Sequence, residues 1–282
     1  MHAHYSLYLL KGSAKTILID TGHPIHWDAV RRDVDTFLAG RAIDYIFPTH
    51  SELPHSGLLE RWMREFPEAV AVGDLRDYPL YYPSLQKRFR QVAAGDTLDL
   101  GDRQFLFLPP VWRDLPDTLW AFDTKDRILF LSDACAYFHA HVPGQCDHLS
   151  SEIAPPDIAM MQDFNDKALH WPKFTDSRPT FPEMDELIAR LRPRLLAGAH
   201  GCVVDTPDST LPLQAGYRHG ARGGMSAPAS METEGLAEII PGTLFATGAG
   251  WMWRRVPLAG CRGARAACYR CRAISCGMAG SG

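Results

Sequence analysis

The chain has 282 residues, of which 46% are apolar and 22% are charged, an ordinary composition for a globular protein with a substantial core. Its formal net charge of -4 supplies none of the positive field that attracts nucleic acid or anionic lipid. We therefore expect neither a nucleic-acid partner nor a membrane-surface partner.

The N-terminal sequence lacks the cationic start, the apolar stretch and the cleavage site of a secretory signal. No segment approaches the roughly 18 consecutive apolar residues that a membrane helix needs, so we expect a cytoplasmic protein. Four of the seven cysteines lie beyond residue 260, and the other three, Cys135, Cys146 and Cys202, are too scattered to predict a disulfide framework.

The first part of the chain alternates between strand-like and helix-like patterns. Residues 5–11 and 15–20 have the β-rich composition and turn spacing of a hairpin. Apolar side chains at helical spacing predict helices over residues 30–38 and 58–66. Two further segments have the composition of strands, residues 43–50 and 69–73.

The second part contains three short β-rich runs in succession: residues 103–109, 118–123 and 127–133. Residues 136–182 have no clean period, and we assign no element there. A helix is expected over residues 183–193, followed by a strand over residues 194–200.

The C-terminal part is poor in amphipathic patterns. Residues 205–235 are rich in Gly, Ser, Pro and Ala, which predicts a long exposed loop, whereas residues 241–256 can form one or two final strands. Residues 258–282 contain no acidic residue, and we interpret them as a disordered tail or a translated frameshift. We therefore predict one domain over residues 1–257 and a tail over residues 258–282.

Three of the predicted strands end directly in a potential metal ligand, namely His50, Asp133 and His200. Strand ends that meet at one edge of a sheet hold side chains rigidly, and the adjoining loops can supply further ligands. The loop after the first of these strands contributes Glu52 and His55. Imidazole together with carboxylate suits zinc, iron or manganese. The sequence therefore predicts a centre that holds one or two divalent metal ions.

The order of these residues resembles the metallo-β-lactamase superfamily over roughly residues 5 to 255. The resemblance rests on four segments: Asp20-Thr21-Gly22 after a strand, the loop His50-x-Glu52-x-Pro54-His55 before a helix, the strand-terminal Asp133, and Ala199-His200-Gly201. It implies an α/β fold, a four-layered αββα sandwich, and a structural role for Asp20 as a hydrogen-bond acceptor beside the site.

Within that superfamily, Glu52 in the second position is similar to the flavodiiron proteins and their stand-alone di-iron relatives. The segment Arg113–Thr118 also resembles a stretch of those proteins, and it places Asp114 where they carry a histidine, with 18 residues between it and Asp133. Pro54 stands where the family carries a ligand aspartate, and a proline side chain has no donor atom.

Carried over residue by residue, the resemblance implies two metal positions. His50, Glu52 and Asp114 would surround one metal, Asp133 would bridge, and His55 with His200 would hold the other. The second position is then short of a ligand, so it binds weakly, recruits water, or stays empty and leaves a mononuclear centre.

We rank a metal-dependent hydrolase of a small molecule first, because a divalent ion lowers the pKa of bound water toward neutrality. Asp133 would hold the metal, and Glu52 or Asp114 would act as a general base. The resemblance implies a second hypothesis, a non-haem di-iron protein that binds or reduces oxygen or nitric oxide with an external electron donor. Pro54 motivates a third, a degenerate subunit of a hetero-oligomeric enzyme.

The three hypotheses share a divalent metal cofactor and a small-molecule substrate. We expect iron or zinc, with manganese as a further candidate, and a homo- or hetero-oligomer that acts on a small molecule.

Overall fold

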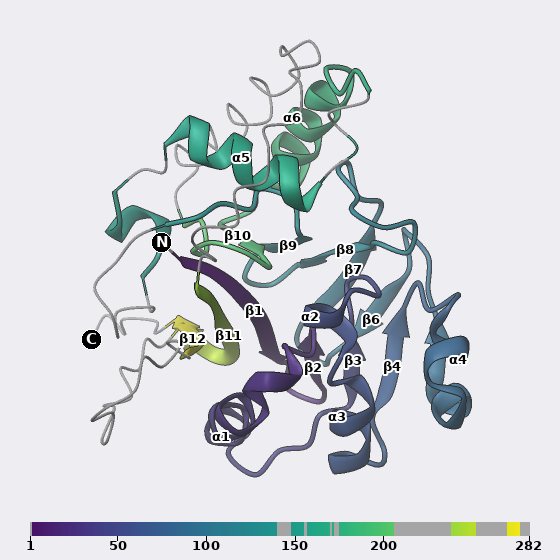
Figure 1. Ribbon diagram of the computed structural model, residues 1–282. Helices are drawn as coiled ribbons and strands as arrows, with labels where there is room; N and C mark the ends of the chain where they lie inside the picture. The colour runs from purple at the N-terminus through teal and green to yellow at the C-terminus, as the bar shows by residue number, and fades with distance from the viewer. Residues whose placement is uncertain are drawn as a thin grey trace, which may run out of the picture.

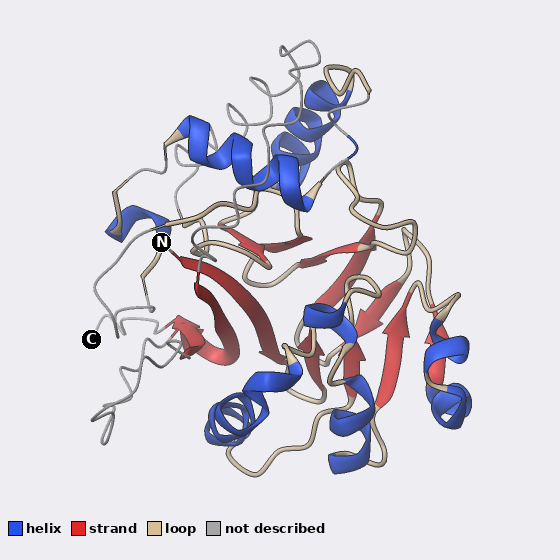
Figure 2. Ribbon diagram, viewed as in Figure 1, coloured by secondary structure: helices blue, strands red, loops and turns tan. Residues whose placement is uncertain are grey.

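The computed structural model describes residues 2–139, 148–154, 157–169, 171, 175–205, 238–251 and 270–276. Two β-sheets lie face to face, and helices cover the outer face of each sheet (Figure 1, Figure 2). The expected four-layered αββα sandwich is therefore confirmed.

One sheet has seven strands in the order β12-β11-β1-β2-β3-β4-β5. Their bounds are β1 (His2–Lys11), β2 (Thr16–Ile19), β3 (Tyr45–Phe47), β4 (Val70–Gly73), β5 (Phe89–Gln91), β11 (Glu238–Trp251) and β12 (Arg270–Cys276). The antiparallel pair β1–β2 is the expected hairpin, whereas β2, β3, β4 and β5 are successive parallel neighbours. The C-terminal ends of these parallel strands consequently meet at one edge of the sheet.

The other sheet has five strands in the order β10-β9-β8-β7-β6. Their bounds are β6 (Thr97–Asp99), β7 (Gln104–Leu108), β8 (Trp120–Asp123), β9 (Ile128–Ser132) and β10 (Leu195–Gly198). The strands β6 to β9 form an antiparallel meander, and β10 joins β9 in parallel. The ends of β9 and β10 therefore point to the same edge.

The helices agree with the predicted periodicity where that periodicity was clear. Their bounds are α1 (Trp27–Leu38), α2 (Leu53–Ser56), α3 (Leu59–Glu65), α4 (Tyr78–Tyr81), α5 (Ile158–Ala168) and α6 (Thr180–Leu191), with short 3-10 turns at Pro24–His26, Pro83–Arg88 and Ser150–Glu152. The helix α1 ends where Ala39 and Gly40 adopt positive φ. The helix α5 lies in the stretch for which we predicted no element.

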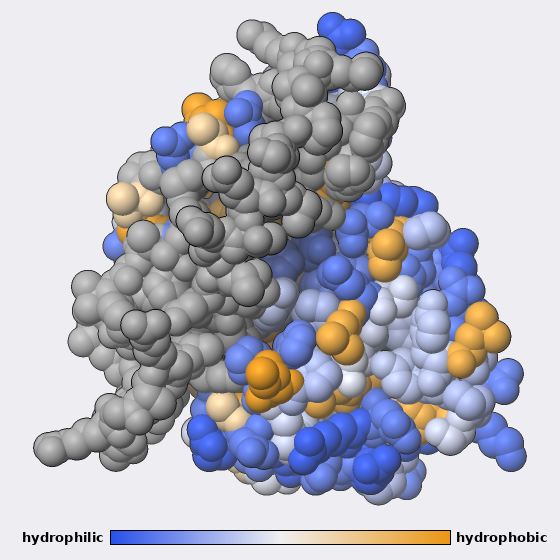
Figure 3. Space-filling view, in the orientation of Figure 1, coloured by the Kyte–Doolittle hydropathy of each residue, from blue (hydrophilic) through white to orange (hydrophobic). Residues whose placement is uncertain are grey.

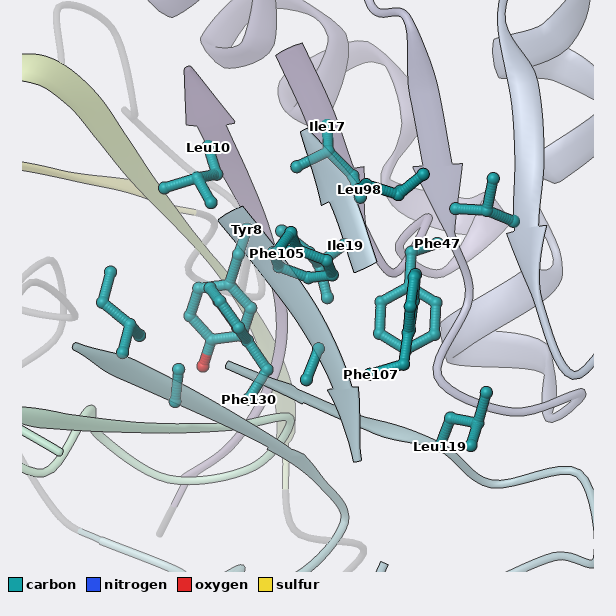
Figure 4. Packing of buried hydrophobic residues seen from close by; sticks show 14 of the residues in the cluster. Tyr8, Leu10, Ile17, Ile19, Phe47, Leu98, Phe105, Phe107, Leu119 and Phe130 are labelled. Atoms are coloured by element: carbon teal, nitrogen blue, oxygen red, sulfur yellow. The ribbon is translucent and has the colours of Figure 1, made fainter. Parts of the chain in front are cut away.

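Three apolar clusters hold the layers together. Side chains from both sheets, among them Phe47, Phe105 and Phe130, meet in the central layer (Figure 4). A second cluster joins the seven-stranded sheet to α1 and α3, with Trp62 fully buried. A third lies beneath α5 and α6, where Met184 is buried. Burial of apolar area at about 25 cal/mol per Å² is the main force that fixes the two sheets against each other.

The predicted domain boundary and C-terminal tail stay predictions. The predicted loop over residues 205–235 lies outside them except for its first residue. Within residues 258–282, for which we expected disorder, Arg270–Cys276 form β12 in parallel with β11. The boundary at residue 257 stays a prediction.

Over the described ranges, no helix has the length and apolar character needed to cross a membrane. The described surface in Figure 3 is mainly hydrophilic with separate apolar spots.

Candidate metal centre

The centre forms where strand ends from both sheets meet. Asp133 follows the last residue of β9 directly, and His200 follows β10 after one intervening residue. The Ala199 N–H donates to the Ser132 carbonyl at 2.7 Å, and the Ser6 N–H donates to the Ala199 carbonyl at 2.8 Å. Because Ser6 belongs to β1, these two bonds connect the sheets at the edge where the ligands lie.

His50 faces three carboxylates. Its Nε2 atom lies 3.6 Å from Asp114 Oδ2, 3.7 Å from Glu52 Oε2 and 3.8 Å from Asp133 Oδ2. Asp114 comes from the loop between β7 and β8, whereas Glu52 directly precedes α2. The structure therefore brings together four of the predicted ligands that are separated by up to 83 residues in the chain.

The other two predicted ligands face the opposite oxygen of the same carboxylate. The Nε2 atom of His55 lies 3.2 Å from Asp133 Oδ1, and the Nε2 atom of His200 lies 3.4 Å from it. All six predicted ligands consequently form one cluster. Four of them, His50, Glu52, His55 and Asp133, place ligand atoms within 4.8 Å of one another.

The buried donor atoms fit a cation. His50 Nε2, His55 Nε2 and Asp133 Oδ1 are inaccessible to solvent and have no hydrogen-bond partner among the described residues. His55 Nε2 and Asp133 Oδ1 attract each other across 3.2 Å, but His50 Nε2 is at least 3.6 Å from each of the three carboxylates it faces. A buried polar atom left without a hydrogen bond costs about 1–3 kcal/mol, a cost that a bound cation would remove. Imidazole nitrogen and carboxylate oxygen are the donors that divalent transition metals prefer. The donor set therefore suits a divalent metal, and the role of each residue as a ligand stays a proposal.

Neighbouring polar side chains orient the two histidines of the loop. His55 Nδ1 donates to Asp20 Oδ2 at 3.0 Å, and Asp20 Oδ1 accepts the Thr49 N–H at 2.8 Å. His50 Nδ1 lies 2.8 Å from Ser132 Oγ, which also contacts Thr49 Oγ1 at 2.9 Å. With the proton assigned to Nδ1 in both rings, each Nε2 lone pair is directed at the centre. The expectation that Asp20 is a hydrogen-bond acceptor beside the site is confirmed.

The sequence interpretation missed Ser132 and Thr49. Each residue directly precedes a predicted ligand at the end of a strand, and its small hydroxyl group was the signal that could have identified it. Asp20 and Ser132 both adopt left-handed backbone, with φ of 59° and 55°. Such a conformation costs a residue with a side chain about 1 kcal/mol or more and tends to occur at functional sites. Here it turns the chain out of β2 and β9 into the centre.

The charges of the centre depend on one another. Burial alone would raise the pKa of Asp133, but the adjacent His55, His200 and His50 bring it well below its usual range. Burial would lower the pKa of His55, yet the carboxylates of Asp20 and Asp133 raise it well above the usual value. The histidines therefore keep Asp133 ionised in spite of its burial.

Two groups at the margin have raised pKa values. Burial, assisted by the negative charge of Asp133, raises the pKa of Asp114 to about 6. Burial and the charges of Glu52 and Asp133 raise the pKa of Tyr5 to about 12. The Tyr5 phenol therefore keeps its proton at neutral pH. Tyr5 is a further neighbour of the site that the sequence interpretation missed.

Comparison with known proteins gives the evolutionary context. The family model described as "Metallo-beta-lactamase superfamily" matches residues 4–144, half of the chain. The coenzyme F420H(2) oxidase of Methanothermobacter marburgensis is 31% identical over 226 residues, which cover 77% of this chain and 54% of the oxidase. The anaerobic nitric oxide reductase flavorubredoxin of Salmonella typhi is 33% identical over 141 residues, which cover 46% of this chain and 28% of the flavorubredoxin.

A solved structure gives the same result for the fold. The rubredoxin oxygen:oxidoreductase of Desulfovibrio gigas superposes with a TM-score of 0.62 at 20% sequence identity, covering 78% of this chain and 54% of that protein. The chain thus spans about half the length, or less, of the relatives it matches.

These comparisons correct the first functional hypothesis. We expected a metal-dependent hydrolase, but the named relatives are an oxidase and a reductase, so the hydrolase assignment is wrong. The predicted role of Glu52 or Asp114 as a general base in hydrolysis is therefore wrong as well. The error has a physical reason, because histidine and carboxylate ligands are compatible with both hydrolytic and redox metal chemistry. The αββα architecture, the ligand order and the family match together show that the chain belongs to the metallo-β-lactamase superfamily, with relatives among the flavodiiron oxidoreductases.

Proposed function

We propose that the protein is a non-haem iron oxidoreductase that binds or reduces oxygen or nitric oxide with electrons from an external donor. The observation that supports the proposal is the cluster of buried imidazole and carboxylate groups of His50, His55 and Asp133, in a chain whose relatives are named as an oxidase and a nitric oxide reductase. Iron is favoured over zinc because zinc has no redox chemistry.

The side chains of the centre have separate tasks in this proposal. His50, His55 and His200 provide nitrogen ligands, and Glu52, Asp114 and Asp133 provide oxygen ligands. Bound iron would pass electrons from the external donor to the substrate. The burial of His50 and His55 keeps bulk water away from their ring nitrogens, whereas the Glu52 carboxylate is half exposed.

Tyr5 and Asp20 support the centre from outside the ligand set. The ring of Tyr5 packs edge-on to His200, with centroids 5.3 Å apart, and so helps to fix the position of that imidazole. Asp20 holds the proton of His55 at Nδ1 and so keeps Nε2 available as a ligand.

The test is iron content together with oxygen consumption. Protein purified without added metal is analysed for iron, reduced chemically, and mixed with oxygen or nitric oxide while substrate loss is followed with an electrode. His50→Ala should lose most of the iron and the consumption. His148→Ala is the matched control, because His148 lies next to Glu152 at 3.7 Å and takes no part in the cluster. Iron-loaded wild-type protein that consumes neither gas would contradict the proposal.

A different result would revive the third hypothesis. If the purified chain binds less than one equivalent of metal and gains activity after co-expression with a related protein, the chain is a non-catalytic subunit.

A further inference from the structure

Asp114 is a candidate ligand with a short reach. It stands where the flavodiiron proteins carry a histidine, and a carboxylate extends less far from the backbone than an imidazole. The Asp114 side chain is 16% exposed, and its Oδ2 atom lies 3.6 Å from His50 Nε2. Two ligands of one ion, with bonds of roughly 2 Å, lie no more than about 4 Å apart. Because the side chain has little length to spare, its contact with the centre depends on where the backbone of its loop is held.

The two peptide planes that flank Asp114 are each held by a side-chain hydrogen bond. A peptide group is planar, so a bond to its carbonyl or to its N–H restrains the whole group. The carbonyl of Arg113 belongs to the plane before Asp114, and it accepts a hydrogen bond from the Trp171 indole N–H at 2.7 Å. The N–H of Leu115 belongs to the plane after Asp114, and it donates to Thr118 Oγ1 at 3.0 Å. The direction in which the Asp114 side chain leaves the backbone is therefore set from both sides.

The two sides of this loop differ in how they are anchored. On the side toward β8, the Leu119 N–H donates to the carbonyl of Thr49 at 2.9 Å, and Thr49 directly precedes the ligand His50. That side is joined to the centre by the backbone itself. On the side toward β7, the Arg113 backbone makes no hydrogen bond to the described residues other than the one from Trp171. The indole therefore supplies the restraint that the backbone does not.

Two tryptophans connect the β7 side of the loop to the C-terminal half of the described chain. The Trp112 indole N–H donates to Oγ1 of Thr180, the first residue of α6, at 2.7 Å, and its ring packs edge-on to Phe181 with centroids 5.9 Å apart. Trp112 is fully buried, whereas Trp171 is partly buried against the same apolar cluster. Trp112 anchors the chain two residues before Asp114, but Trp171 bonds to the peptide group beside it. Orientation of the carboxylate is therefore assigned to Trp171.

We propose that Trp171 is a positioning residue that holds Asp114 at the distance from His50 required to bind the metal. It acts through the Arg113 carbonyl, 58 residues away in the sequence. Trp171 lies in the stretch of residues 136–182 for which the sequence predicted no element. This inference rests on the proposed function, since it concerns a ligand of the proposed metal centre.

The experiment is a double-mutant cycle on metal affinity. Trp171→Phe keeps an aromatic ring and removes the N–H, whereas Asp114→Ala removes the carboxylate. The wild type, both single variants and the double variant are titrated, metal-free, with Co²⁺ against a chromophoric chelator. Co²⁺ binds the same nitrogen and oxygen donors as Fe²⁺, and its visible absorption reports the arrangement of its ligands. His148→Ala is again the control, and circular dichroism shows that each variant is folded.

We expect Trp171→Phe to weaken Co²⁺ binding about tenfold, the lower end of the loss that follows from altering one partner of a metal ligand. In the Asp114→Ala background, the same change should alter the affinity by less than about twofold, because the group that Trp171 positions is gone. The visible spectrum of Trp171→Phe should shift toward that of Asp114→Ala. Thr118→Val removes the hydroxyl that holds the other peptide plane. It should show the same dependence on Asp114, and it provides the test if Trp171→Phe does not fold.

Three results would overturn the positioning role. Equal losses of affinity in the two backgrounds would mean that Trp171 acts on the general structure and not on Asp114. A Trp171→Phe protein that binds Co²⁺ as the wild type does would make the indole bond dispensable, and an unchanged affinity of Asp114→Ala would remove Asp114 from the ligands. In each case, iron binding and gas consumption by the wild-type protein would leave the proposed function intact. Conversely, the expected coupling in a protein that consumes neither gas when loaded with iron would overturn the proposed function alone.

Discussion

Replacement of Asp20 by asparagine should weaken metal binding without altering the fold. The new amide oxygen can keep the bond from the Thr49 N–H, which Asp20 Oδ1 accepts at 2.8 Å. The amide NH₂ group then occupies the place of Oδ2, which lies 3.0 Å from His55 Nδ1. Because that group donates, His55 Nδ1 must accept, and the ring proton moves to Nε2, the atom that faces the centre. Asparagine tolerates the left-handed backbone at this position, where φ is 59°.

The size of the effect follows from the role of Asp20 as a partner of a ligand. Such replacements cost about 10- to 100-fold in metal affinity, which corresponds to about 1.4–2.8 kcal/mol. The measurement is competition for Fe²⁺ or Mn²⁺ against a chromophoric chelator, with Asp99→Asn as the control. Asp99 is exposed and accepts a bond from the Gly101 N–H, which asparagine can also accept. If Asp20→Asn binds metal within twofold of the wild type, the argument about the ring proton is refuted.

Three further substitutions and one labelling experiment test other parts of the structure. Ser132→Ala removes the hydroxyl 2.8 Å from a ligand imidazole, so metal affinity in the chelator assay should fall about tenfold. Pro54→Asp adds a carboxylate to the ligand loop, and elemental analysis should show a rise in the second equivalent of metal, whereas an unchanged ratio would argue against a missing ligand there. Gly201→Ala should lower the free energy of unfolding by about 1–3 kcal/mol, because φ is +87° and the new Cβ would lie 2.6 Å from the Tyr137 ring. An unchanged midpoint of urea unfolding would contradict the close contact between Gly201 and Tyr137. Burial raises the pKa of the Cys135 thiol to about 12, so iodoacetamide should label it slowly up to about pH 10 in the folded protein, as read by peptide mass spectrometry. Rapid labelling at pH 8 would contradict the burial of Cys135. The thiol ionises at a lower pH in the unfolded chain than in the folded protein, so its ionisation should lower the free energy of unfolding as the pH rises from about 8.5 toward 12.

The cluster of candidate ligands could be predicted because the positions of these side chains follow from local sequence. His50, Asp133 and His200 each follow an apolar run of strand length, and such runs must be buried between layers. Their ends therefore lie at the edge of a sheet, where a ligand is rigid and reachable. The two-sheet architecture was predictable for a similar reason, since the order of strands and helices and the ligand motif resemble one superfamily.

The identity of the reaction could not be predicted from the ligand types. Imidazole and carboxylate serve a hydrolytic zinc ion and a redox iron ion equally well. The choice of hydrolysis was wrong for that reason, and the relatives corrected it. The helix α5 was missed although it has a local start signal, in which the Asp157 side chain accepts a hydrogen bond from the Ala159 N–H at its first turn.

The sequence by itself determined which imidazole and carboxylate groups are candidate ligands and which strands carry them, because burial and spacing are local properties. Only the tertiary structure decided how those groups are arranged. Ser132 orients His50 across 82 residues, and Asp133 faces His50 with one carboxylate oxygen and His55 and His200 with the other. Such contacts depend on the register and packing of separate strands to within a fraction of an ångström, which no local pattern encodes.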